Sequence, residues 1–440
     1  MENLTGGTPP VRYLPCVVPC KLYFVGGYII LQEPIHEIKK LNIGIKNGII
    51  AYIGDSVMGA KSYVEASESL ISPAFINGHL HFGEYYLRGT GAASTAEYID
   101  LGERFYMATK EYKNQIRCSS IDNVVHESIL FGSLTLCGAR GWPHIFSHPI
   151  NYFLGYPLMN SAKLGSYAKD FEYFFERLST TEREKYYISL HSLQYTTTDV
   201  LQRIAKVKRL YPNCILSLHL YESIEERTCI ERRMKRNALN VLQEYGLVDD
   251  KTLLVHCNYI NDEDIDIIEK QHASVVVCYN SNLRLGNKPC EIQRLKDRGI
   301  NIIAATDGPA TGDGLSLLDN LKTIGYLTGI SSWELFDMIT INPASFFGSN
   351  VGQIKIGNRA DLLFFDIMRP EFIYEEKLIE NLIYSSGVRP KMIMKDGNTI
   401  VEDYTICDSI GRKAVIDNKK KTLELLRDIG VSNVLFKNDL

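Results

Sequence analysis

Short apolar runs recur through the middle of this 440-residue chain, separated by segments long enough for a helix. Four of these segments, 198–210, 224–245, 262–271 and 291–298, have the spacing of amphipathic helices. Strands that are apolar throughout and alternate with helices predict a parallel sheet covered on both faces, here an α/β fold of the (β/α)₈ barrel type. The predicted strands are Ser72–Gly78, Ser133–Cys137, His144–Ser147, Tyr187–Leu190, Cys214–Leu218, Thr252–Val255, Ser274–Cys278 and Asn301–Ala305.

The two ends of the chain show a different sequence pattern, with shorter apolar runs interrupted by turn residues. Gly26-Gly27 and Asn47-Gly48 punctuate residues 21–70, and similar stretches return at 351–366 and 390–397. These patterns predict β-hairpins. We therefore expect residues 73–349 to form the barrel, with 1–72 and 350–440 forming one composite small β-sandwich domain. Its C-terminal tail is polar and is expected to contain a helix near 419–428.

Composition limits the classes of protein that fit. The formal net charge is −4, without the basic excess of a nucleic-acid surface. No run approaches the roughly 18 apolar residues that a membrane span needs, and the N-terminus lacks the pattern of a secretory signal. The ten cysteines form no CxxC pair, which favours reduced thiols over a structural zinc site. The sequence predicts a cytoplasmic protein that binds neither nucleic acid nor membrane.

Polar residues with metal-binding chemistry stand where the apolar runs end. In a (β/α)₈ barrel the carboxyl ends of the strands form the active-site face. Residues i and i+2 of a strand share a face, so the two histidines of the first run are expected to point the same way. The residues at the strand ends are His79, His81, His191, His219, His256 and Asp307.

Each of these signals has an ordinary structural explanation when it is taken alone. A chance His-x-His pair is expected about 0.2 times in such a composition, and the spacing of His219 and Glu222 is commoner still. A single histidine at a strand end can be a hydrogen-bonded core residue, and Asp307 could cap a helix or sit in a turn. Their order on the first, fifth, sixth and eighth units favours one metal centre.

The chain resembles the amidohydrolase superfamily, in particular its mononuclear metal-dependent deaminase and chlorohydrolase branch. That branch includes S-adenosylhomocysteine/methylthioadenosine deaminases, guanine and 8-oxoguanine deaminases, and triazine hydrolases. The resemblance covers nearly the whole chain, including the divided β domain. The matching segments are Ile76–His81, Leu87–Gly89, His191-Ser192, His219–Glu222, Val255-His256, Ser281–Gly286, Ala305–Pro309 and Gly352–Asp361.

The resemblance implies a role for each residue of the centre. The metal ligands would be His79, His81, His219 and Asp307. Glu222 would be the proton shuttle, and His256 would act with Asp307 on the attacking water. His191 stands where binuclear relatives carry a bridging lysine, which favours a single ion. The residues expected to contact the substrate are His191, Arg88, Asn282 and His148, the last of which follows the third predicted strand.

Three imidazoles and a carboxylate suit a divalent ion, zinc first and iron second. Such an ion lowers the pKa of a bound water from about 15.7 towards about 7, which gives hydroxide at neutral pH. We therefore predict hydrolytic deamination, by metal-hydroxide attack, of an amino-substituted N-heterocycle such as a purine, pterin, triazine or modified nucleoside. The resemblance also favours a homodimer.

Two alternatives remain at this point. A hydrolase of the same fold could expel chloride or open a ring amide. A barrel that has lost catalysis could serve as a scaffold, although all the candidate ligands are present here. Cys278 is closer to guanine-type and triazine enzymes than to adenosine-type deaminases, which usually have histidine there.

Overall fold

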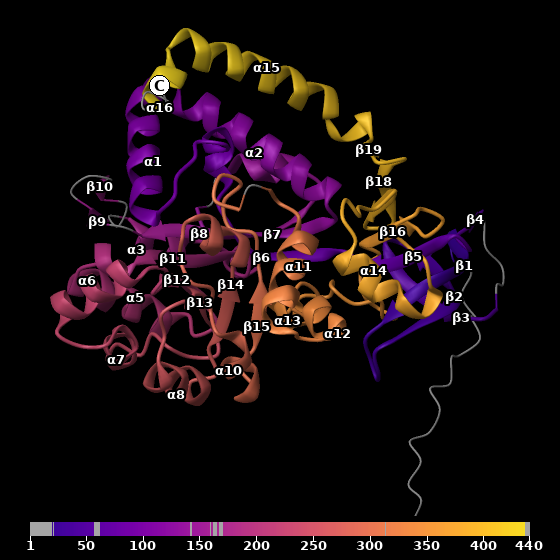
Figure 1. The fold of residues 1–440 in the computed structure, drawn as a ribbon, viewed down its shortest axis with the longest axis horizontal. Coiled ribbons are helices and arrows are strands. Elements are labelled where there is room, and N and C mark those ends of the chain that lie inside the picture. Colours follow the sequence, from indigo (N-terminus) through magenta and orange to yellow (C-terminus); the bar gives the residue numbers. More distant parts are fainter. Residues whose placement is uncertain are drawn as a thin grey trace, which may run out of the picture.

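In a computed structural model, two large sheets organise the chain, and β9 (Asn160–Ser161) and β10 (Gly165–Ser166) form a small third one (Figure 1). The structure describes residues 20–435 apart from 21, 57–61, 141–142, 159, 162–164, 167–169 and 313. One large sheet comes from the middle of the sequence and the other joins both ends of the chain.

The middle sheet is a parallel barrel of eight strands. Its first and last strands, β6 and β15, lie against each other, and the backbone N–H of Asp307 donates to the carbonyl of His79 (3.2 Å) across this join. The predicted (β/α)₈ architecture is therefore confirmed. The barrel strands, in chain order, are β6 (Phe75–Leu80), β7 (Ser133–Gly138), β8 (Asn151–Leu158), β11 (Tyr186–Ser192), β12 (Leu216–Leu220), β13 (Thr252–His256), β14 (Ser274–Val277) and β15 (Ile302–Ala304).

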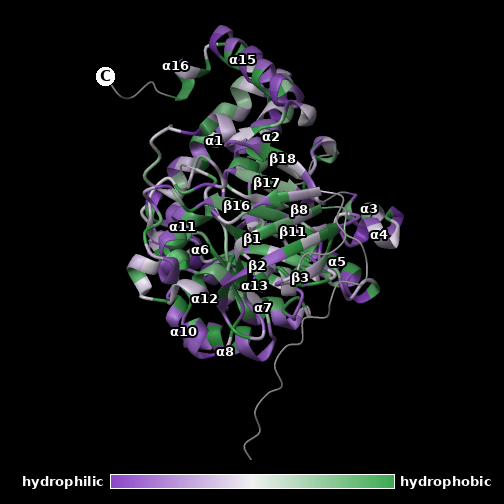
Figure 2. Ribbon diagram, turned by 90° about the vertical axis from the view of Figure 1, so that its right-hand side faces the viewer, coloured by the Kyte–Doolittle hydropathy of each residue, from purple (hydrophilic) through white to green (hydrophobic). Residues whose placement is uncertain are grey.

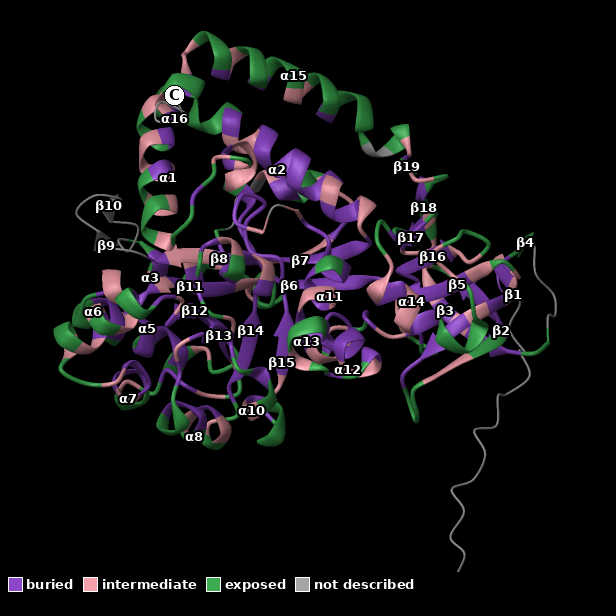
Figure 3. Ribbon diagram, in the orientation of Figure 1, coloured by how far each residue is buried: buried purple, intermediate pink, exposed green. Residues whose placement is uncertain are grey.

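Helices cover the outside of the barrel. Hydrophobic residues gather on the strands and hydrophilic ones on the outward helix faces (Figure 2), and burial follows the same division (Figure 3). The helices between and after the barrel strands are α1 (Thr95–Thr109), α2 (Lys113–Leu130), α3 (Phe171–Arg177), α4 (Thr180–Arg183), α5 (Thr198–Leu210), α6 (Ile224–Met234), α7 (Ala238–Glu244), α8 (Asp262–Lys270), α9 (Tyr279–Arg284), α10 (Ile292–Asp297), α11 (Leu317–Thr328), α12 (Ser332–Asp337) and α13 (Ile341–Phe347). Short 3₁₀ helices, η1 (Phe82–Leu87) and η3 (Pro143–Ser147), follow β6 and β7.

The second sheet is built from both ends of the chain. β5 pairs with β16 antiparallel, which joins the N-terminal strands to the C-terminal ones. Its members are β1 (Leu22–Leu31), β2 (Glu37–Lys46), β3 (Ile49–Gly54), β4 (Ser62–Glu65), β5 (Ser69–Pro73), β16 (Leu362–Asp366), β17 (Met392–Lys395), β18 (Asn398–Glu402) and β19 (Thr405–Ile406). A division of the chain at residues 72/73 and 349/350 stays our proposal.

The C-terminal segment is helical and lies on the barrel's own helices. Its main helix, α15 (Arg412–Asp428), packs on α2, and the short α16 (Val431–Leu435) packs on α1; α14 (Leu378–Tyr384) lies earlier, between β16 and β17 (Figure 1). α15 is amphipathic, with Val415, Thr422 and Leu426 buried beneath an exposed outer face. None of the helices in the described ranges combines the length and apolar character that a membrane span requires.

The third predicted strand was wrong. His144–Ser147 forms the turn η3, and the strand of this unit is β8. Pro143 at the first position favours a helical turn, because proline has a fixed φ and no N–H to satisfy there. Gly155 and Pro157 interrupt the apolar and aromatic residues of β8, and both residue types are uncommon inside strands.

Three further details depart from the expected pattern. Segment 224–245 is two helices, because Lys235 adopts φ +56° and ends α6 before Asn237 caps α7. Gly26-Gly27 is a bulge inside β1, where the pairing with β2 shifts register, whereas Asn47-Gly48 does form a turn. Residues 351–357 are a loop instead of a strand.

Candidate metal centre

The carboxyl ends of three barrel strands, β6, β12 and β15, bring the predicted metal ligands together. His79 lies on β6 and His81 directly follows it, while His219 lies on β12. Asp307 follows β15 with φ +60°, a left-handed conformation that few residues other than glycine adopt. The hydrogen bond from its N–H to the carbonyl of His79 holds this unusual backbone next to the first strand.

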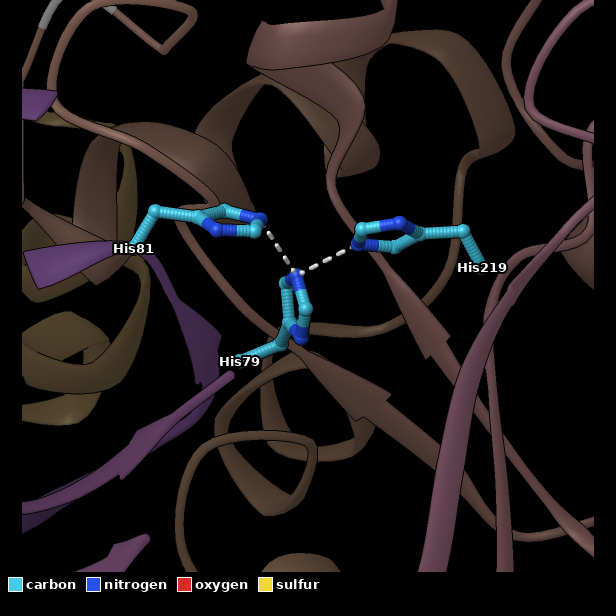
Figure 4. A group of neighbouring side chains, drawn as sticks. All are labelled: His79, His81 and His219. Carbon is cyan, nitrogen blue, oxygen red and sulfur yellow. Dashed lines mark hydrogen bonds between the residues drawn. The ribbon is translucent and has the colours of Figure 1, made fainter. Parts of the chain in front are cut away.

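The donor atoms converge on one point (Figure 4). The Nε2 atom of His79 lies 3.2 Å from Nε2 of His81 and 3.2 Å from Nε2 of His219. Asp307 Oδ1 lies 3.5 Å from His79 Nε2 and 3.2 Å from His81 Nε2. All four residues are at most 8% exposed, so the cluster is enclosed by protein.

These distances fit a bound divalent ion. Ligands about 2.1 Å from a tetrahedral ion are roughly 3.4 Å apart, which is close to the separations observed here. Burial lowers the pKa of His79 to about 4 and the pKa of His219 well below its usual value. Both imidazoles are therefore neutral at neutral pH and have a lone pair to offer a metal.

The carboxylate of Asp307 is oriented by two hydroxyl groups. Its Oδ2 atom accepts hydrogen bonds from Ser281 (2.6 Å) and Thr311 (2.9 Å), which leaves Oδ1 facing the histidines. Burial alone would raise the pKa of Asp307, but the imidazoles of His79 and His81 hold it well below its usual range. The group is therefore an anion at neutral pH, as a metal ligand must be.

Glu222 lies beside this cluster, just past the end of β12. Its Oε1 atom accepts a hydrogen bond from the hydroxyl of Thr95 (3.2 Å), and its Oε2 atom lies 3.8 Å from Nε2 of His256. Burial, reinforced by the negative charge of Asp307, raises the pKa of Glu222 to about 8. A carboxyl group that is still protonated at neutral pH can donate a proton.

His256 is held by a chain of side-chain amides. Its Nδ1 atom lies 3.0 Å from Oδ1 of Asn282, whose Nδ2 donates to Oδ1 of Asn258 (2.8 Å). Asn258 in turn donates to the backbone carbonyl of Glu222 (2.9 Å). If Nδ1 carries the proton towards Asn282, the lone pair on Nε2 faces Glu222. Asn282 is fully buried behind His256, so the structure gives it a positioning contact.

Of the other residues predicted to contact the substrate, His191 lies beside the metal ligands, whereas Arg88 and His148 bond to other residues. His191, on β11, lines a small cavity with His81, His219 and Arg140. Arg88 is engaged elsewhere, because its guanidinium donates two hydrogen bonds to Glu127 (2.8 and 2.9 Å) and one to the carbonyl of Pro309 (3.1 Å). His148 does not join this group and bonds instead with Asp122 on α2.

The sequence reasoning missed several residues near the centre, among them Glu84, Tyr98 and Arg140. Glu84 Oε1 lies 3.6 Å from Nδ1 of His81, and Tyr98 donates to its Oε2 atom (2.6 Å). Arg140 enters the cavity from the end of β7. Glu84 stands three residues after a histidine, the spacing that singled out Glu222, and Arg140 is the first charged residue after a predicted strand. Both signals were therefore present, whereas Tyr98 had none.

Comparison with known proteins identifies the family. The model of the Amidohydrolase family matches residues 160–400, more than half of the chain. The chain belongs to the amidohydrolase family.

Similar proteins span nearly the whole chain. A 5-methylthioadenosine/S-adenosylhomocysteine deaminase of Pyrococcus furiosus is 24% identical over 90% of this chain and 99% of its own length. The zinc-bound structure of an adenosine deaminase from Xanthomonas campestris has a TM-score of 0.83 at 19% identity, covering 93% of this chain and 99% of that one. An atrazine chlorohydrolase of Arthrobacter aurescens, complexed with zinc, has a TM-score of 0.81 at 17% identity, covering 91% and 99%.

Proposed function

We propose that this chain is a metal-dependent hydrolytic deaminase that removes an amino group from an N-heterocycle. The observation that carries the proposal is the pairing of a buried His₃Asp cluster with Glu222, a carboxyl group whose pKa burial raises to about 8. The first provides a site for one divalent ion and the second a proton donor beside it. Hydrolytic removal of ammonia requires both functions.

For each step of the deamination that the protein itself must perform, a suitable side chain lies at the site. When bound by His79, His81, His219 and Asp307, a divalent ion supplies Lewis acidity that lowers the pKa of the attacking water. Burial lowers the pKa of the His256 imidazole, so the ring is neutral and its Nε2 atom has a lone pair that can accept a proton from that water.

Glu222 then acts on the heterocycle. Its protonated carboxyl is positioned by Thr95 and can donate to a ring nitrogen. The carboxylate then takes up the proton that left the attacking water through His256, 3.8 Å away, and passes it to the departing amino group. The proton of the newly added hydroxyl restores the carboxyl when ammonia leaves. His191 lines the adjoining cavity and can contact the ring. The enclosed position of the cluster excludes bulk water, which strengthens these electrostatic contacts.

The names of the similar proteins support the choice of substrate class and leaving group. The Pyrococcus furiosus and Xanthomonas campestris proteins are named as deaminases of adenosine-type compounds, which supports ammonia as the leaving group. The Arthrobacter aurescens chlorohydrolase shows that the same fold can accompany loss of chloride. Zinc is our proposal for the metal, because imidazole and carboxylate suit it and both structural relatives bind it.

A substrate panel tests this function. The zinc-loaded protein is incubated with aminopurines, aminopterins, aminotriazines and adenosine-type nucleosides, alongside their chloro analogues, and ammonia and chloride are measured. Ammonia release from at least one amino compound, lost in His219→Ala, is expected. Chloride release alone would favour the chlorohydrolase alternative, and neither product with any heterocycle would refute deamination. His272→Asn, at an exposed histidine, is the matched control.

Three sequence-based predictions remain open beside this proposal. They are a homodimer, a cytoplasmic location and the absence of a nucleic-acid partner.

A further inference from the structure

A second group of metal-binding side chains lies where α2, η3 and α15 meet. Asp122 comes from α2, His144 from η3, and His148 directly follows η3. Nε2 of His144 lies 2.6 Å, and Nε2 of His148 3.0 Å, from the same Oδ1 atom of Asp122. One potential metal-ligand atom of each residue lies within 4.8 Å of those of the other two. The same is true of His79, His81 and His219.

The group is mostly buried but open on one side. Asp122 is 7% exposed and the side chain of His148 is 6% exposed, whereas the side chain of His144 is 31% exposed. The hydrogen bonds to Asp122 keep its carboxylate ionised, because they lower its pKa despite the opposing effect of burial. An ion could therefore enter past His144 and meet an anionic oxygen.

A further imidazole beside the group has one nitrogen without a hydrogen-bond partner in the part of the chain that the structure describes. His126 is one helical turn after Asp122 on the same face of α2, and its ring centroid lies 6.0 Å from that of His148. It is 8% exposed, and its Nε2 atom has no hydrogen-bond partner among the described residues. Burial lowers the pKa of His126 to about 4, so the ring is neutral. A buried polar atom left unpaired is costly, unless a ligand occupies it.

We propose that Asp122, His144 and His148 bind a second divalent ion, with His126 adjacent as a further ligand. The set of imidazoles and one carboxylate suits zinc, as at the catalytic cluster. Hydrogen-bond separations of 2.6 and 3.0 Å are shorter than the roughly 3.4 Å between ligands of a tetrahedral ion, so binding requires the side chains to move apart by less than about 1 Å.

The position of this site gives it a structural role. Asn418 of α15 donates to Oδ2 of Asp122 (3.0 Å), and the neighbouring Lys419 donates to the hydroxyl of Tyr85 (2.7 Å). An ion on Oδ1 would thus hold η3 against α2, the helix on which α15 also packs. The segment it fastens begins just beyond Arg140, which lines the catalytic cavity.

Zinc stoichiometry tests the proposal in the full-length protein. Wild type, His219→Ala, Asp122→Asn and the double variant are loaded with Zn²⁺, freed of excess ion and assayed by elemental analysis. We expect about two, one, one and zero ions per chain. Equal zinc in wild type and Asp122→Asn would show that the group is a hydrogen-bonded triad only, and would overturn the proposal. Zinc lost with Asp122→Asn but not with His219→Ala would uphold this site and refute the catalytic one.

A milder variant tests the site even if Asp122→Asn fails to fold. His144→Gln replaces the most exposed ligand and leaves the contacts of His148 and Asn418 with Asp122 in place. In the His219→Ala background it should weaken Zn²⁺ affinity at least about tenfold, whereas His272→Asn should not change it. A chelator should lower the Tm of His219→Ala but leave that of the double variant unchanged. Unchanged Zn²⁺ affinity in His144→Gln would contradict the proposal.

Discussion

The Oε2 atom of Glu222 lies 3.8 Å from Nε2 of His256, and the backbone carbonyl of the same glutamate is tied to that histidine through Asn258 and Asn282. The proposed proton donor, Glu222, and the proposed proton acceptor, His256, are therefore held in a fixed relative position. Burial raises the pKa of the carboxyl and lowers that of the imidazole. One group keeps its proton and the other lacks one, which is the distribution that hydrolytic deamination needs at its start.

Replacing Glu222 by glutamine should abolish most turnover but leave the metal in place. The amide keeps the size of the side chain and cannot donate an acidic proton, so we expect kcat to fall by about 10²-fold or more. Ammonia release and elemental analysis on the same preparation measure both effects. Glu225→Gln, on the exposed face of α6, is the matched control and should retain activity. Full activity in Glu222→Gln would assign the proton donor elsewhere.

The pH profile should report the same group. The pKa of Glu222 is raised to about 8, so its carboxyl is protonated below that pH and ionised above it. Since the proposed role needs the protonated form, kcat/KM should decline as the pH rises through about 8. The residual activity of Glu222→Gln should lack this alkaline limb. A wild-type profile that is flat to well above pH 8 would disagree with the assignment.

Arg88 is expected to stabilise the loop after β15. Arg88→Met removes a two-point ion pair with Glu127 and the bond to Pro309, and Glu127→Gln should have a similar effect because Glu127 also accepts from the N–H of Leu315 (3.2 Å). Each variant should lose about 1–3 kcal/mol of unfolding free energy, measured by denaturant titration. A raised KM in Arg88→Met alone, at unchanged stability, would instead support the substrate contact predicted from the sequence.

The hydroxyls behind Asp307 should tune the affinity for the metal. Ser281→Ala with Thr311→Val removes both hydrogen bonds to Oδ2, and loss of such supporting contacts typically weakens metal binding by about 10–100-fold. Competition with a chromogenic chelator measures this change. Thr228→Val, at an exposed hydroxyl on α6, serves as the control. Unaltered affinity in the double variant would mean that Asp307 is oriented by its backbone alone.

The barrel and the convergence of its polar strand ends could be predicted because they follow from local pattern. A buried parallel strand must be apolar, so the histidine or aspartate that ends it stands out. The same criterion failed for β8, whose apolar and aromatic residues are interrupted by Gly155 and Pro157. It also misplaced His148, which was assigned to the end of a strand that is in fact the turn η3.

Contacts between distant segments could not be predicted. Arg88 meets Glu127 and Pro309 only after the barrel closes, and Asn282 reaches His256 from the next unit. Hydrophobic periodicity carries no information about such pairs, because each of these side chains resembles an ordinary surface or turn residue within its own segment. The group around Asp122 likewise combines α2 and η3 with α15, whose Asn418 lies 296 residues after Asp122 in the sequence.

His79, His81, His219 and Asp307 should together hold one divalent ion beside Glu222. Anomalous diffraction at the zinc edge, from crystals of the zinc-loaded protein, can locate that ion. We expect a peak about 2.1 Å from Nε2 of each histidine and from a carboxylate oxygen of Asp307, and we expect it to disappear in His219→Ala. A map with no peak at this position, from protein that releases ammonia, would contradict this assignment.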